Sequence, residues 1–324
     1  MAGTAPFAPF EWMIAWRYLR ARRSEGGISV MTWISLVGIA LAVFALIATL
    51  AVRSGFRYEF VDTIVGANPH VSVMSYGETL PDGRLTRTLA DYDAVAERLA
   101  AVPGVERAVP VVSGQVMATG QGRNTGVQVI GMRRDDLAAV PRIAQPEEAQ
   151  GSLAEYGAGN DPGIAIGSGV ARTLGMGVGD RIRLISPDGV KTAFGTSPRI
   201  KAYPVVFVFQ VGRYDIDGTR IYMPFAEAQE YFNRPGVADE VQVSIGDPEE
   251  VDRIGPALAV AAGANAYLWT WKDSSGAFLR ALQMEDNIMF VILSILVLIA
   301  TLNITSGLVM LVKNKGRDIG ILRT

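Results

Sequence analysis

Few residues in this chain are of the types that carry out chemistry, and their spacing fits no catalytic centre. Cysteine is absent, which excludes disulfide bonds, thiolate metal sites and thiol catalysis. His70 is the only histidine, so a two-histidine zinc motif is impossible and a serine–histidine–aspartate triad would have to use it. His70 begins an expected strand and no G-x-S-x-G motif exists to partner it, which favours a structural role.

Two other groups of residues resemble binding motifs only superficially. The glycine-rich segment GMGVGD (175–180) precedes a strand instead of linking a strand to a helix, so we interpret it as a turn. The dipeptide Gly-Lys does not occur, which excludes a P-loop. The acid pairs Asp135–Asp136 and Glu249–Glu250 are interpreted as solvated charges. We therefore predict a protein that is not an enzyme, holds no metal, and acts by binding and movement.

Two long stretches without a charged residue, 26–52 and 287–312, dominate the architecture. A helix needs about 20 apolar residues to cross a bilayer core of about 30 Å. Each stretch exceeds this length, so we predict two transmembrane helices. A cleaved signal peptide is the alternative for the first stretch, but its apolar core is too long and no small-x-small cleavage site follows it.

Basic residues flank the two stretches and predict their orientation. Because lysine and arginine resist translocation, both ends are expected in the cytoplasm and residues 53–286 outside the membrane. The basic residues of the two ends are Arg17, Arg20, Arg22, Arg23, Lys313, Lys315, Arg317 and Arg323. Of the 30 basic and 32 acidic residues in the chain, 22 and 29 lie between the stretches. The outer region is therefore mildly acidic, which argues against a nucleic-acid partner.

Residues 1–25 combine aromatic residues with late arginines. This pattern predicts an amphipathic helix along the membrane surface, in contact with lipid, or else a plain extension of the first transmembrane helix.

The region between the stretches alternates strand and helix patterns. Six segments rich in branched residues are expected as strands: 70–75, 127–132, 163–167, 180–186, 205–214 and 240–246. Three segments are expected as helices: 91–102, 225–233 and 248–263. Long irregular loops are expected at 133–163 and 186–204. The fold class is therefore α+β, a membrane protein with a mixed α+β outer domain.

Small and polar residues within the two apolar stretches indicate helix packing. Gly38 and Ala42 continue a ridge of small residues that begins at Ser35, and Asn303 places an amide in the second stretch. Simple lipid anchoring is the alternative. Packing in a bundle would require more than two helices, from a partner or from sequence beyond residue 324.

The chain ends on an amphipathic pattern whose purpose composition alone does not explain. The segment VKNKGRDIGILRT (312–324) is similar to the K-x-G-E-I-G-I-L-R-T segment of MacB/FtsX-type ABC transporter permeases, with Asp318 where glutamate is usual. We expect the pattern to form a second short helix that faces a partner protein.

The start of the chain, AWRYLRARRSEGGISVMTWISLVGIALAVFALIATLAVRSGFRYEF, resembles the narrower LolC/LolE group of lipoprotein-releasing permeases. So do GVERAVPVVSGQVMATG (104–120), LGMGVGDRIRLISP (174–187), VGRYDIDGTRIYMP (211–224) and LQMEDNIMFVILSILVLIATLNITSGLVMLV. The resemblance implies an inner-membrane protein with a periplasmic domain of two subdomains, the inserted one covering about 113–204. It also implies four transmembrane helices, so residues 313–324 would begin a coupling segment at which this chain is truncated.

One loop refines the resemblance. FGTSPRIKAYPVVF (194–207) is similar to the hook by which LolC-like subunits hold the periplasmic lipoprotein chaperone LolA, which implies a hook loop at about 187–204. The residues matched to the hook are Phe194, Gly195, Pro198 and Arg199. A merged LolF-type subunit that acts as a homodimer would also carry a hook, so this alternative to a LolC–LolE heterodimer remains open.

The family resemblance implies the partners and the cargo. A LolD-like ATPase dimer, which binds ATP and magnesium that this chain does not, would dock on Lys315, Arg317, Asp318, Ile319 and Leu322. Lipoprotein acyl chains would lie between the first helices of two permease subunits, against Val43, Phe44, Ile47, Leu50 and Phe56. The alternatives are a MacB-type efflux permease, an FtsX-type regulator that transmits force, and a two-span membrane sensor.

Overall fold

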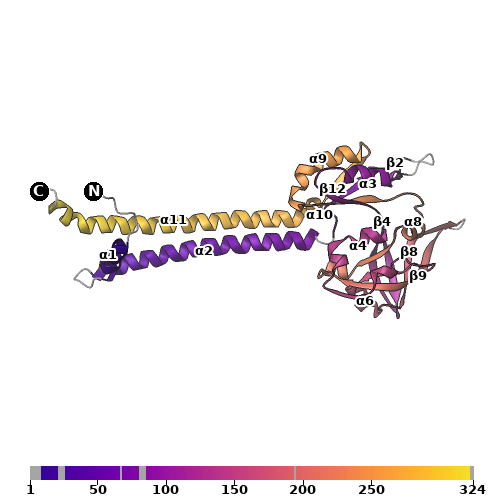
Figure 1. Ribbon diagram of the computed structural model, residues 1–324, viewed down its shortest axis with the longest axis horizontal. Coiled ribbons are helices and arrows are strands. Elements are labelled where there is room, and N and C mark those ends of the chain that lie inside the picture. The colour runs from indigo at the N-terminus through magenta and orange to yellow at the C-terminus, as the bar shows by residue number, and fades with distance from the viewer. Residues whose placement is uncertain (1–8, 21–25, 66–67, 80–84, 193–194, 322–324) are drawn as a thin grey trace. The chain divides into compact units, whose positions relative to one another are not determined.

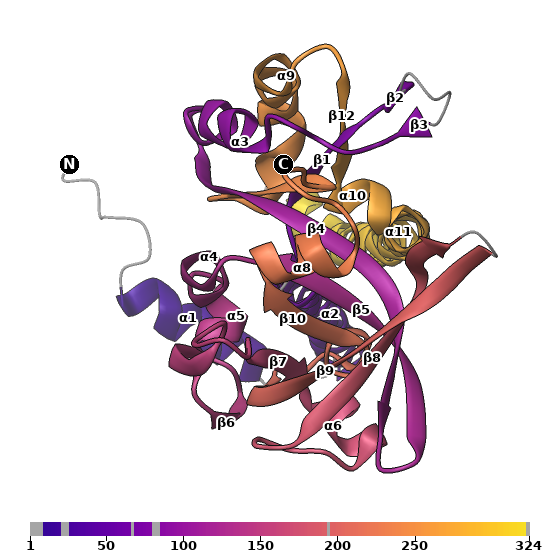
Figure 2. The ribbon, with the colours of Figure 1, turned by 90° about the vertical axis from the view of Figure 1, so that its right-hand side faces the viewer.

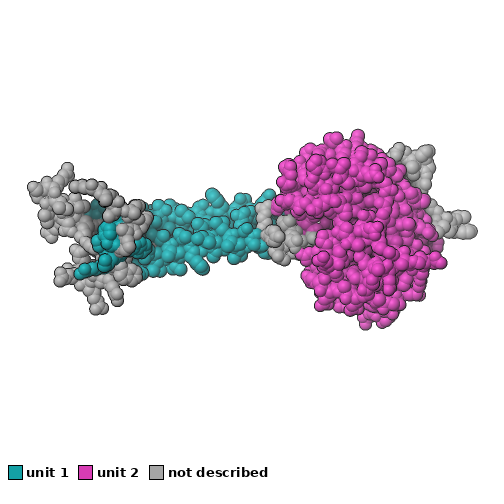
Figure 3. All heavy atoms as spheres, viewed as in Figure 1, with its two compact units in different colours: residues 1–57, 277–324 teal, residues 58–276 magenta. Residues whose placement is uncertain are grey.

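A computed structural model describes residues 9–20, 26–65, 68–79, 85–192 and 195–321. The chain divides into two compact units, residues 1–57 with 277–324 and residues 58–276 (Figure 3). The first unit consists of helices, and the second is built around a β-sheet. Each unit is described by itself below.

Three helices make up the first unit: α1 (Pro9–Arg20), most of α2 (Gly26–Val65) and nearly all of α11 (Gly276–Ile321). The helices α2 and α11 run side by side (Figure 1). By length and composition, each can cross a membrane, over Leu36–Phe56 and Leu279–Met310. α2 extends beyond the charge-free stretch 26–52 at its C-terminal end, and α11 extends beyond 287–312 at both ends, because helical hydrogen bonding continues into the polar residues there.

One side of α2 and one side of α11 are half-buried. On α11 the half-buried residues recur every three or four positions, as on the contact face of paired helices. They include Leu279, Leu282, Asp286, Met289, Leu293, Leu296 and Ala300 on α11, and Ile39, Ala42, Ala45, Leu46, Ala48 and Thr49 on α2. An ion pair of 2.6 Å between Arg53 Nη2 and Asp286 Oδ2 joins the two helices. Most other apolar side chains of both helices face outward, as expected where lipid or further helices cover them.

A ten-stranded sheet forms the centre of the second unit, in the order β12-β1-β11-β4-β5-β10-β7-β9-β6, with β8 pairing to β4 and β9. The strands are β1 (Val71–Ser75), β4 (Val105–Gly120), β5 (Arg123–Met132), β6 (Glu148–Gly151), β7 (Ile164–Gly167), β8 (Arg181–Thr192), β9 (Gly195–Gln210), β10 (Arg220–Pro224), β11 (Glu240–Ile245) and β12 (Ala266–Thr270). A separate small hairpin joins β2 (Glu78–Thr79) to β3 (Leu85–Thr86).

The long strand β4 divides this sheet into two halves. Residues up to Val111 pair with β11, and residues from Val112 onward pair with β5. We call β12, β1, β11 and residues 105–111 of β4 the root half, because β1 follows α2 in the chain and β12 precedes α11. We call residues 112–120 of β4 together with β5 to β10 the hairpin half, because it carries the long β8–β9 hairpin.

Helices cover both halves. α3 (Tyr92–Ala100) and α9 (Val251–Ala262) pack on the root half, above the sheet in Figure 2. α6 (Ser168–Leu174) and α8 (Phe225–Tyr231) pack on the hairpin half. Shorter helices complete the unit: α4 (Arg134–Ala138), α5 (Pro141–Ala144), α7 (Tyr214–Asp217) and α10 (Trp271–Ser274), with the 3₁₀ turns η1 (Leu153–Glu155) and η2 (Pro248–Glu250).

The middle of the sheet is buried on both faces. Successive strand residues enter two different apolar clusters, for example Val112 in one and Val111 in the other. In β7 likewise, Ile164 and Ile166 belong to the first cluster and Ala165 to the second. Neighbouring residues of a strand point to opposite faces, so continuous apolar runs are what a sheet covered on both sides requires.

Most of the expected elements are confirmed. Strands are present within 70–75, 127–132, 163–167, 180–186 and 240–246, and helices within 91–102, 225–233 and 248–263. Of the expected strand 205–214, residues 205–210 belong to β9, which ends at Gln210. Asp91 is the N-cap of α3 but its side chain makes no capping hydrogen bond. The segment 133–163 is less irregular than expected, since it contains α4, α5, β6 and η1. β4, β10 and β12 were not expected from the sequence.

The prediction that residues 186–204 form a loop is wrong. These residues extend β8 and β9 into one long hairpin, paired up to Thr192↔Gly195. Pro187 and Pro198 both fall in the irregular stretch between the Ser186↔Arg199 and Val190↔Ser197 pairs, where the register shifts. Proline has no backbone N–H to donate to a strand ladder, so it is tolerated at such a β-bulge, where the ladder is interrupted. The sheet that carries this hairpin continues to Pro224, past the expected end of the inserted subdomain at 204.

Gly167, the last residue of β7, lies in close contact with the backbone of α7. A Cβ built on Gly167 would lie 2.3 Å from the carbonyl oxygen of Asp217, which is a backbone atom that cannot move aside cheaply. Gly126 in β5 is the matched contrast, because a Cβ there meets nothing within 4 Å.

We predict that Gly167→Ala destabilises the outer unit by about 1–3 kcal/mol, the usual cost of forcing atoms into a packed interior. Gly126→Ala should change the free energy of unfolding by less than about 0.5 kcal/mol. Thermal unfolding of both full-length variants in detergent measures the difference. Equal unfolding temperatures for the two variants would show that the α6–α7 contact does not constrain Gly167.

Candidate functional site

The β8–β9 hairpin is the most prominent candidate for a binding element. It extends beyond the rest of the sheet, to the right in Figure 2. Of the four expected hook residues, Gly195 begins β9 and pairs with Thr192, and Pro198 and Arg199 lie further along the same strand. Phe194 lies outside the described residues. The structure therefore puts Pro198 and Arg199 in the stem of the hairpin, several residues from its turn.

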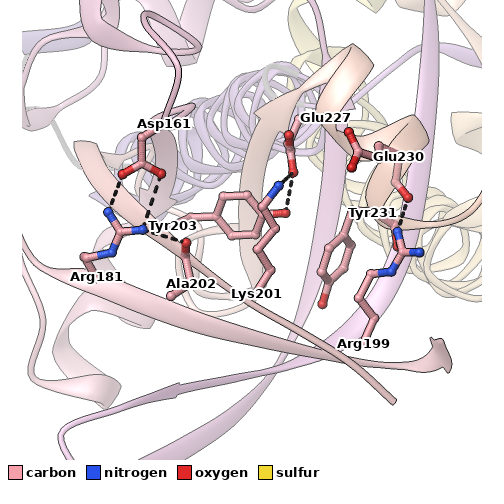
Figure 4. Close-up of polar contacts among 9 residues, drawn as sticks. All are labelled: Asp161, Arg181, Arg199, Lys201, Ala202, Tyr203, Glu227, Glu230 and Tyr231. Atoms are coloured by element: carbon pink, nitrogen blue, oxygen red, sulfur yellow. Dashed lines mark hydrogen bonds and ion pairs between the residues drawn. The ribbon is translucent and has the colours of Figure 1, made fainter. Parts of the chain in front are cut away.

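Alternating residues of β9 separate the stem into two faces. Arg199, Lys201 and Tyr203 point toward α8 (Figure 4). Pro198 and Ile200, one residue out of phase, are exposed, and Ile200 has 59% of its surface accessible. This is the two-residue period of a strand, so one face of the hairpin anchors it and the other is apolar and available.

Arg199 caps the end of α8. Its guanidinium donates to the backbone carbonyl oxygens of Glu230 and Tyr231, the latter at 3.2 Å, and to Asn233 Oδ1 at 2.6 Å. Carbonyls at a helix C-terminus lack partners within the helix and carry partial negative charge, so a cation is favourable there. Asn233 in turn donates from Nδ2 to the Gly189 carbonyl on β8, at 3.2 Å.

Two further contacts fix the stem. Glu227 on α8 accepts from Lys201 Nζ at 2.6 Å and from Tyr203 Oη at 2.7 Å. Burial, reinforced by Glu227, raises the pKa of Tyr203 far above its usual value, so the phenol stays a hydrogen-bond donor. At the start of β8, Arg181 pairs with Asp161 and donates to the Ala202 carbonyl at 3.0 Å. The sequence analysis singled out none of these stem residues except Arg199.

An apolar groove lies against the free face of the hairpin. It has a volume of about 760 Å³, and its lining includes Met117, Val127, Ile185, Pro187 and Pro198. The side chain of Met117 is 44% exposed, which is unusual for a strand in the middle of a sheet. The hairpin and this groove together offer an apolar contact surface, and nothing about them suggests catalysis.

His70 has a structural role. Its Nδ1 accepts from the Ile245 backbone N–H at 3.0 Å, and its own backbone bonds Val243 and Trp271. Burial lowers the pKa of His70 from 6.5 to about 4, so the ring is neutral at pH 7. Among the described residues no group of three or more His, Asp or Glu could hold a metal ion. The segment 175–180 is a turn as expected, with positive φ at Gly175 and Gly179.

The expected acyl-chain contacts share one property. All of them are exposed on α2, between 46% and 69% of their surface: Val43, Phe44, Ile47, Leu50 and Phe56. Of the expected helix-packing residues, Ala42 is half-buried, whereas Gly38 and Asn303 are exposed in this chain. Thr301 and Thr305 donate to carbonyls one turn back in α11, so their hydroxyls do not require a neighbouring helix.

The end of the chain differs from the expectation of a second short helix. α11 continues without a break to Ile321, so Lys315, Arg317, Asp318 and Ile319 belong to the same helix as the apolar stretch. Leu322 lies outside the described residues. The continuous helix places these residues in line with the part of α11 that can cross a membrane.

Comparison with known proteins identifies the relatives of this chain. Residues 32–259 match the MacB-like periplasmic core domain family. The lipoprotein-releasing system transmembrane protein LolC of Neisseria meningitidis is 30% identical over 97% of this chain and 73% of its own length. The corresponding LolE protein of Haemophilus influenzae is 27% identical over the same shares. The solved periplasmic region of MacB from Actinobacillus actinomycetemcomitans covers 68% of this chain and 97% of that structure, with 10% identity and a TM-score of 0.42.

We predict that protonation of His70 destabilises the fold in acid. The pKa is lower in the folded state, so stability is complete above pH 6.5 and is lost as the pH falls from 6.5 toward 4. The full shift corresponds to about 3 kcal/mol. His70→Asn keeps an acceptor near the Nδ1 position but does not titrate, so its stability should fall less than that of the wild type between these pH values.

Thermal unfolding of the wild type and of His70→Asn at pH 7.5, 6, 5 and 4.5 measures this difference. A constant gap between the two proteins across the series would contradict the assignment, because the acidic groups that also titrate there are present in both.

Proposed function

Because the chain belongs to the LolC/LolE family of lipoprotein-releasing transmembrane proteins, we propose that it extracts lipoproteins from the bacterial inner membrane as the permease subunit of an ABC transporter. The similarity over 97% of the chain, with the MacB-like domain between two long apolar helices, carries this proposal. The role is a mechanical one, with ATP hydrolysis assigned to a partner.

The energetics of the cargo explain why such a machine needs a motor. Each buried methylene group is worth about 0.8 kcal/mol, so moving three acyl chains from a bilayer into water costs tens of kcal/mol. We propose that the exposed face of α2 shelters the acyl chains during this transfer, through Val43, Phe44, Ile47, Leu50 and Phe56. All five side chains are largely exposed, and Phe56 lines an apolar pocket together with Leu282 and Met289 of α11.

The hairpin is proposed to deliver the cargo to a LolA-like periplasmic chaperone. Phe194, Gly195 and Pro198 would contact the chaperone directly, since Pro198 is exposed on the apolar face. Arg199 would contribute chiefly by holding the stem on α8, because its side chain already bonds that helix. A stem fixed in this way loses little conformational freedom on binding, which favours affinity.

The remaining partners follow from the same family assignment. We propose that a LolD-like ATPase dimer, with its bound ATP and magnesium, docks on Lys315, Arg317, Asp318, Ile319 and Leu322. A second permease subunit, either LolE-like or another copy of this chain, would complete the membrane part and cover Gly38 and Asn303. Both ends of the chain would be cytoplasmic and the sheet domain periplasmic.

We predict that Phe194→Ala combined with Arg199→Glu weakens chaperone binding at least tenfold, roughly the loss seen when central contact residues are removed. The glutamate also faces the partial negative charge of the α8 carbonyls, so the stem itself loosens. Binding of a LolA-like chaperone to the purified full chain measures the effect. Arg253→Glu on the exposed surface of α9 is the matched charge reversal and should bind normally.

ATP hydrolysis by the assembled complex should stay within about twofold of the wild-type rate in the double variant, because the substitutions lie far along the chain from the coupling segment. Undiminished chaperone binding by the double variant would refute the hook assignment.

We predict that Asp318→Lys uncouples the ATPase from lipoprotein release. The substitution reverses a charge in the proposed docking segment, and misplaced charges at an interface typically cost several kcal/mol. Release of lipoproteins from proteoliposomes and ATPase stimulation by the permease are measured together. Glu97→Lys on the exposed face of α3 is the control reversal. Wild-type release by Asp318→Lys would count against the docking site.

A further inference from the structure

Helix α8 ends in a turn whose key position is usually a glycine. The Arg234 N–H donates to the Gln229 carbonyl at 2.8 Å, and the Asn233 N–H donates to the Glu230 carbonyl at 3.2 Å. These two bonds define a Schellman motif, in which the residue after the helix cap adopts positive φ. Asn233 occupies that position with a φ of 54°. Since glycine adopts this conformation at no steric cost, the backbone here does not require the side chain that Asn233 carries.

The side chain of Asn233 contacts both strands of the β8–β9 hairpin. Its Oδ1 accepts from Arg199 Nη2 on β9 at 2.6 Å, and its Nδ2 donates to the Gly189 carbonyl on β8 at 3.2 Å. A guanidinium only donates hydrogen bonds and a carbonyl oxygen only accepts them, so a bridge between the two needs both an acceptor and a donor. An amide supplies both, and asparagine also tolerates positive φ. Asparagine therefore meets both requirements of this position.

The bridge lies where the pairing of β8 with β9 is interrupted. Regular pairing stops at Ser186↔Arg199 and resumes at Val190↔Ser197, so residues 187–189 of β8 oppose a single residue of β9. A bulge of this kind bends the strand and increases its twist, because the extra residues leave the ladder. The pairing alone therefore leaves the direction of the hairpin beyond the bulge variable.

The two strands and the end of α8 come close together at this bulge. A Cβ on Gly189 would collide with the Ser197 carbonyl oxygen, so only glycine fits there. Arg199, which Asn233 contacts, also donates to the Glu230 and Tyr231 carbonyls at the end of α8. α8 itself packs on β4, β5 and β10. The Asn233 amide therefore connects both strands of the bulge to a helix that is fixed on the sheet.

We infer that Asn233 is a positioning residue that sets the direction of the outer hairpin, residues 190–192 and 195–197, by joining both strands at the bulge to the end of α8. The part of the inference that concerns the chaperone rests on the proposed function. A binding element that is already held in its bound direction loses less conformational freedom on association. Affinity falls in proportion to the fraction of molecules in the competent conformation, so loss of the Asn233 amide lowers chaperone affinity without removing a contact residue.

The direction of the outer hairpin can be measured without any partner. Since cysteine is absent, Ser197→Cys in the outer hairpin and Val260→Cys on the exposed surface of α9 create the only two thiols in this chain. A nitroxide spin label on each gives the distribution of distances between them by pulsed electron paramagnetic resonance of the full chain in detergent. Adding Asn233→Gly removes the amide but keeps the Schellman turn, so the unfolding temperature should be equal or higher. The distance distribution should nevertheless widen.

Asn233→Asp separates the two bonds of the bridge. The carboxylate still accepts from Arg199 and tolerates positive φ, but it cannot donate to the Gly189 carbonyl. The distance distribution should widen as it does in Asn233→Gly. A distribution of the original width in the aspartate variant would show that the bond to Arg199 alone is sufficient, and would overturn the bridging role.

Gln121→Gly is the matched control. Among the described residues, Gln121 is the other non-glycine residue with positive φ, and it lies in the turn between β4 and β5. The substitution makes the same change to the backbone at a place that does not bridge the bulge, so the distance distribution should keep its original width. An equally narrow distribution in Asn233→Gly would overturn the inference, whatever the stability of that variant.

Chaperone binding then tests the consequence for delivery. Asn233→Gly should weaken the binding of a LolA-like chaperone to the full chain by about threefold to tenfold, the range for the loss of hydrogen bonds that keep a binding element in place. The loss should fall mainly on the association rate, because fewer molecules hold the competent direction. Undiminished affinity together with a widened distribution would overturn the role in delivery. If the wild-type chain binds no chaperone, the proposed function fails, while the distance measurement still decides whether Asn233 positions the hairpin.

Discussion

The outer unit depends on a single strand that belongs to both halves of its sheet. β4 pairs with β11 up to Val111 and with β5 from Val112, so it is the one described strand that pairs within both halves. Side-chain contacts support this strand: Asp93 on α3 pairs with Arg133, and Tyr92 on α3 packs edge-on against Phe225 on α8.

The hairpin shows how strand geometry assigns separate tasks to neighbouring residues. Arg199, Lys201 and Tyr203 use charged and polar groups to fix the stem on α8, while Pro198 and Ile200 remain exposed on the opposite face. The same division occurs on α2, where Ala42 faces α11 and Phe44 faces outward. In both elements one face supports the structure and the other is available for partners.

The sequence predicted those helices and strands that have a characteristic length or hydrophobic periodicity. The apolar helices, five strands and three outer helices follow from local patterns, and they are present. The strand β4 was not predicted because Pro110 and Gly114 interrupt its hydrophobic pattern. The prediction of a loop at 186–204 was wrong because prolines at a β-bulge resemble prolines in a loop. The contacts of Arg199 with α8 and of Arg220 with Asn68 join residues 31 to 152 positions apart, and no local pattern encodes such pairs. The roles of the expected site residues remain predictions for the same reason.

The anchoring of the stem has a consequence for how such proteins diversify. The bonds that hold the hairpin on the rest of the domain run from Gly189 and Arg199 through Lys201 and Tyr203 to Arg181. The exposed side chains of Pro198 and Ile200 take no part in these bonds, so they can be exchanged without loosening the attachment. A change in the surface that the hairpin presents would then require only a few amino-acid substitutions.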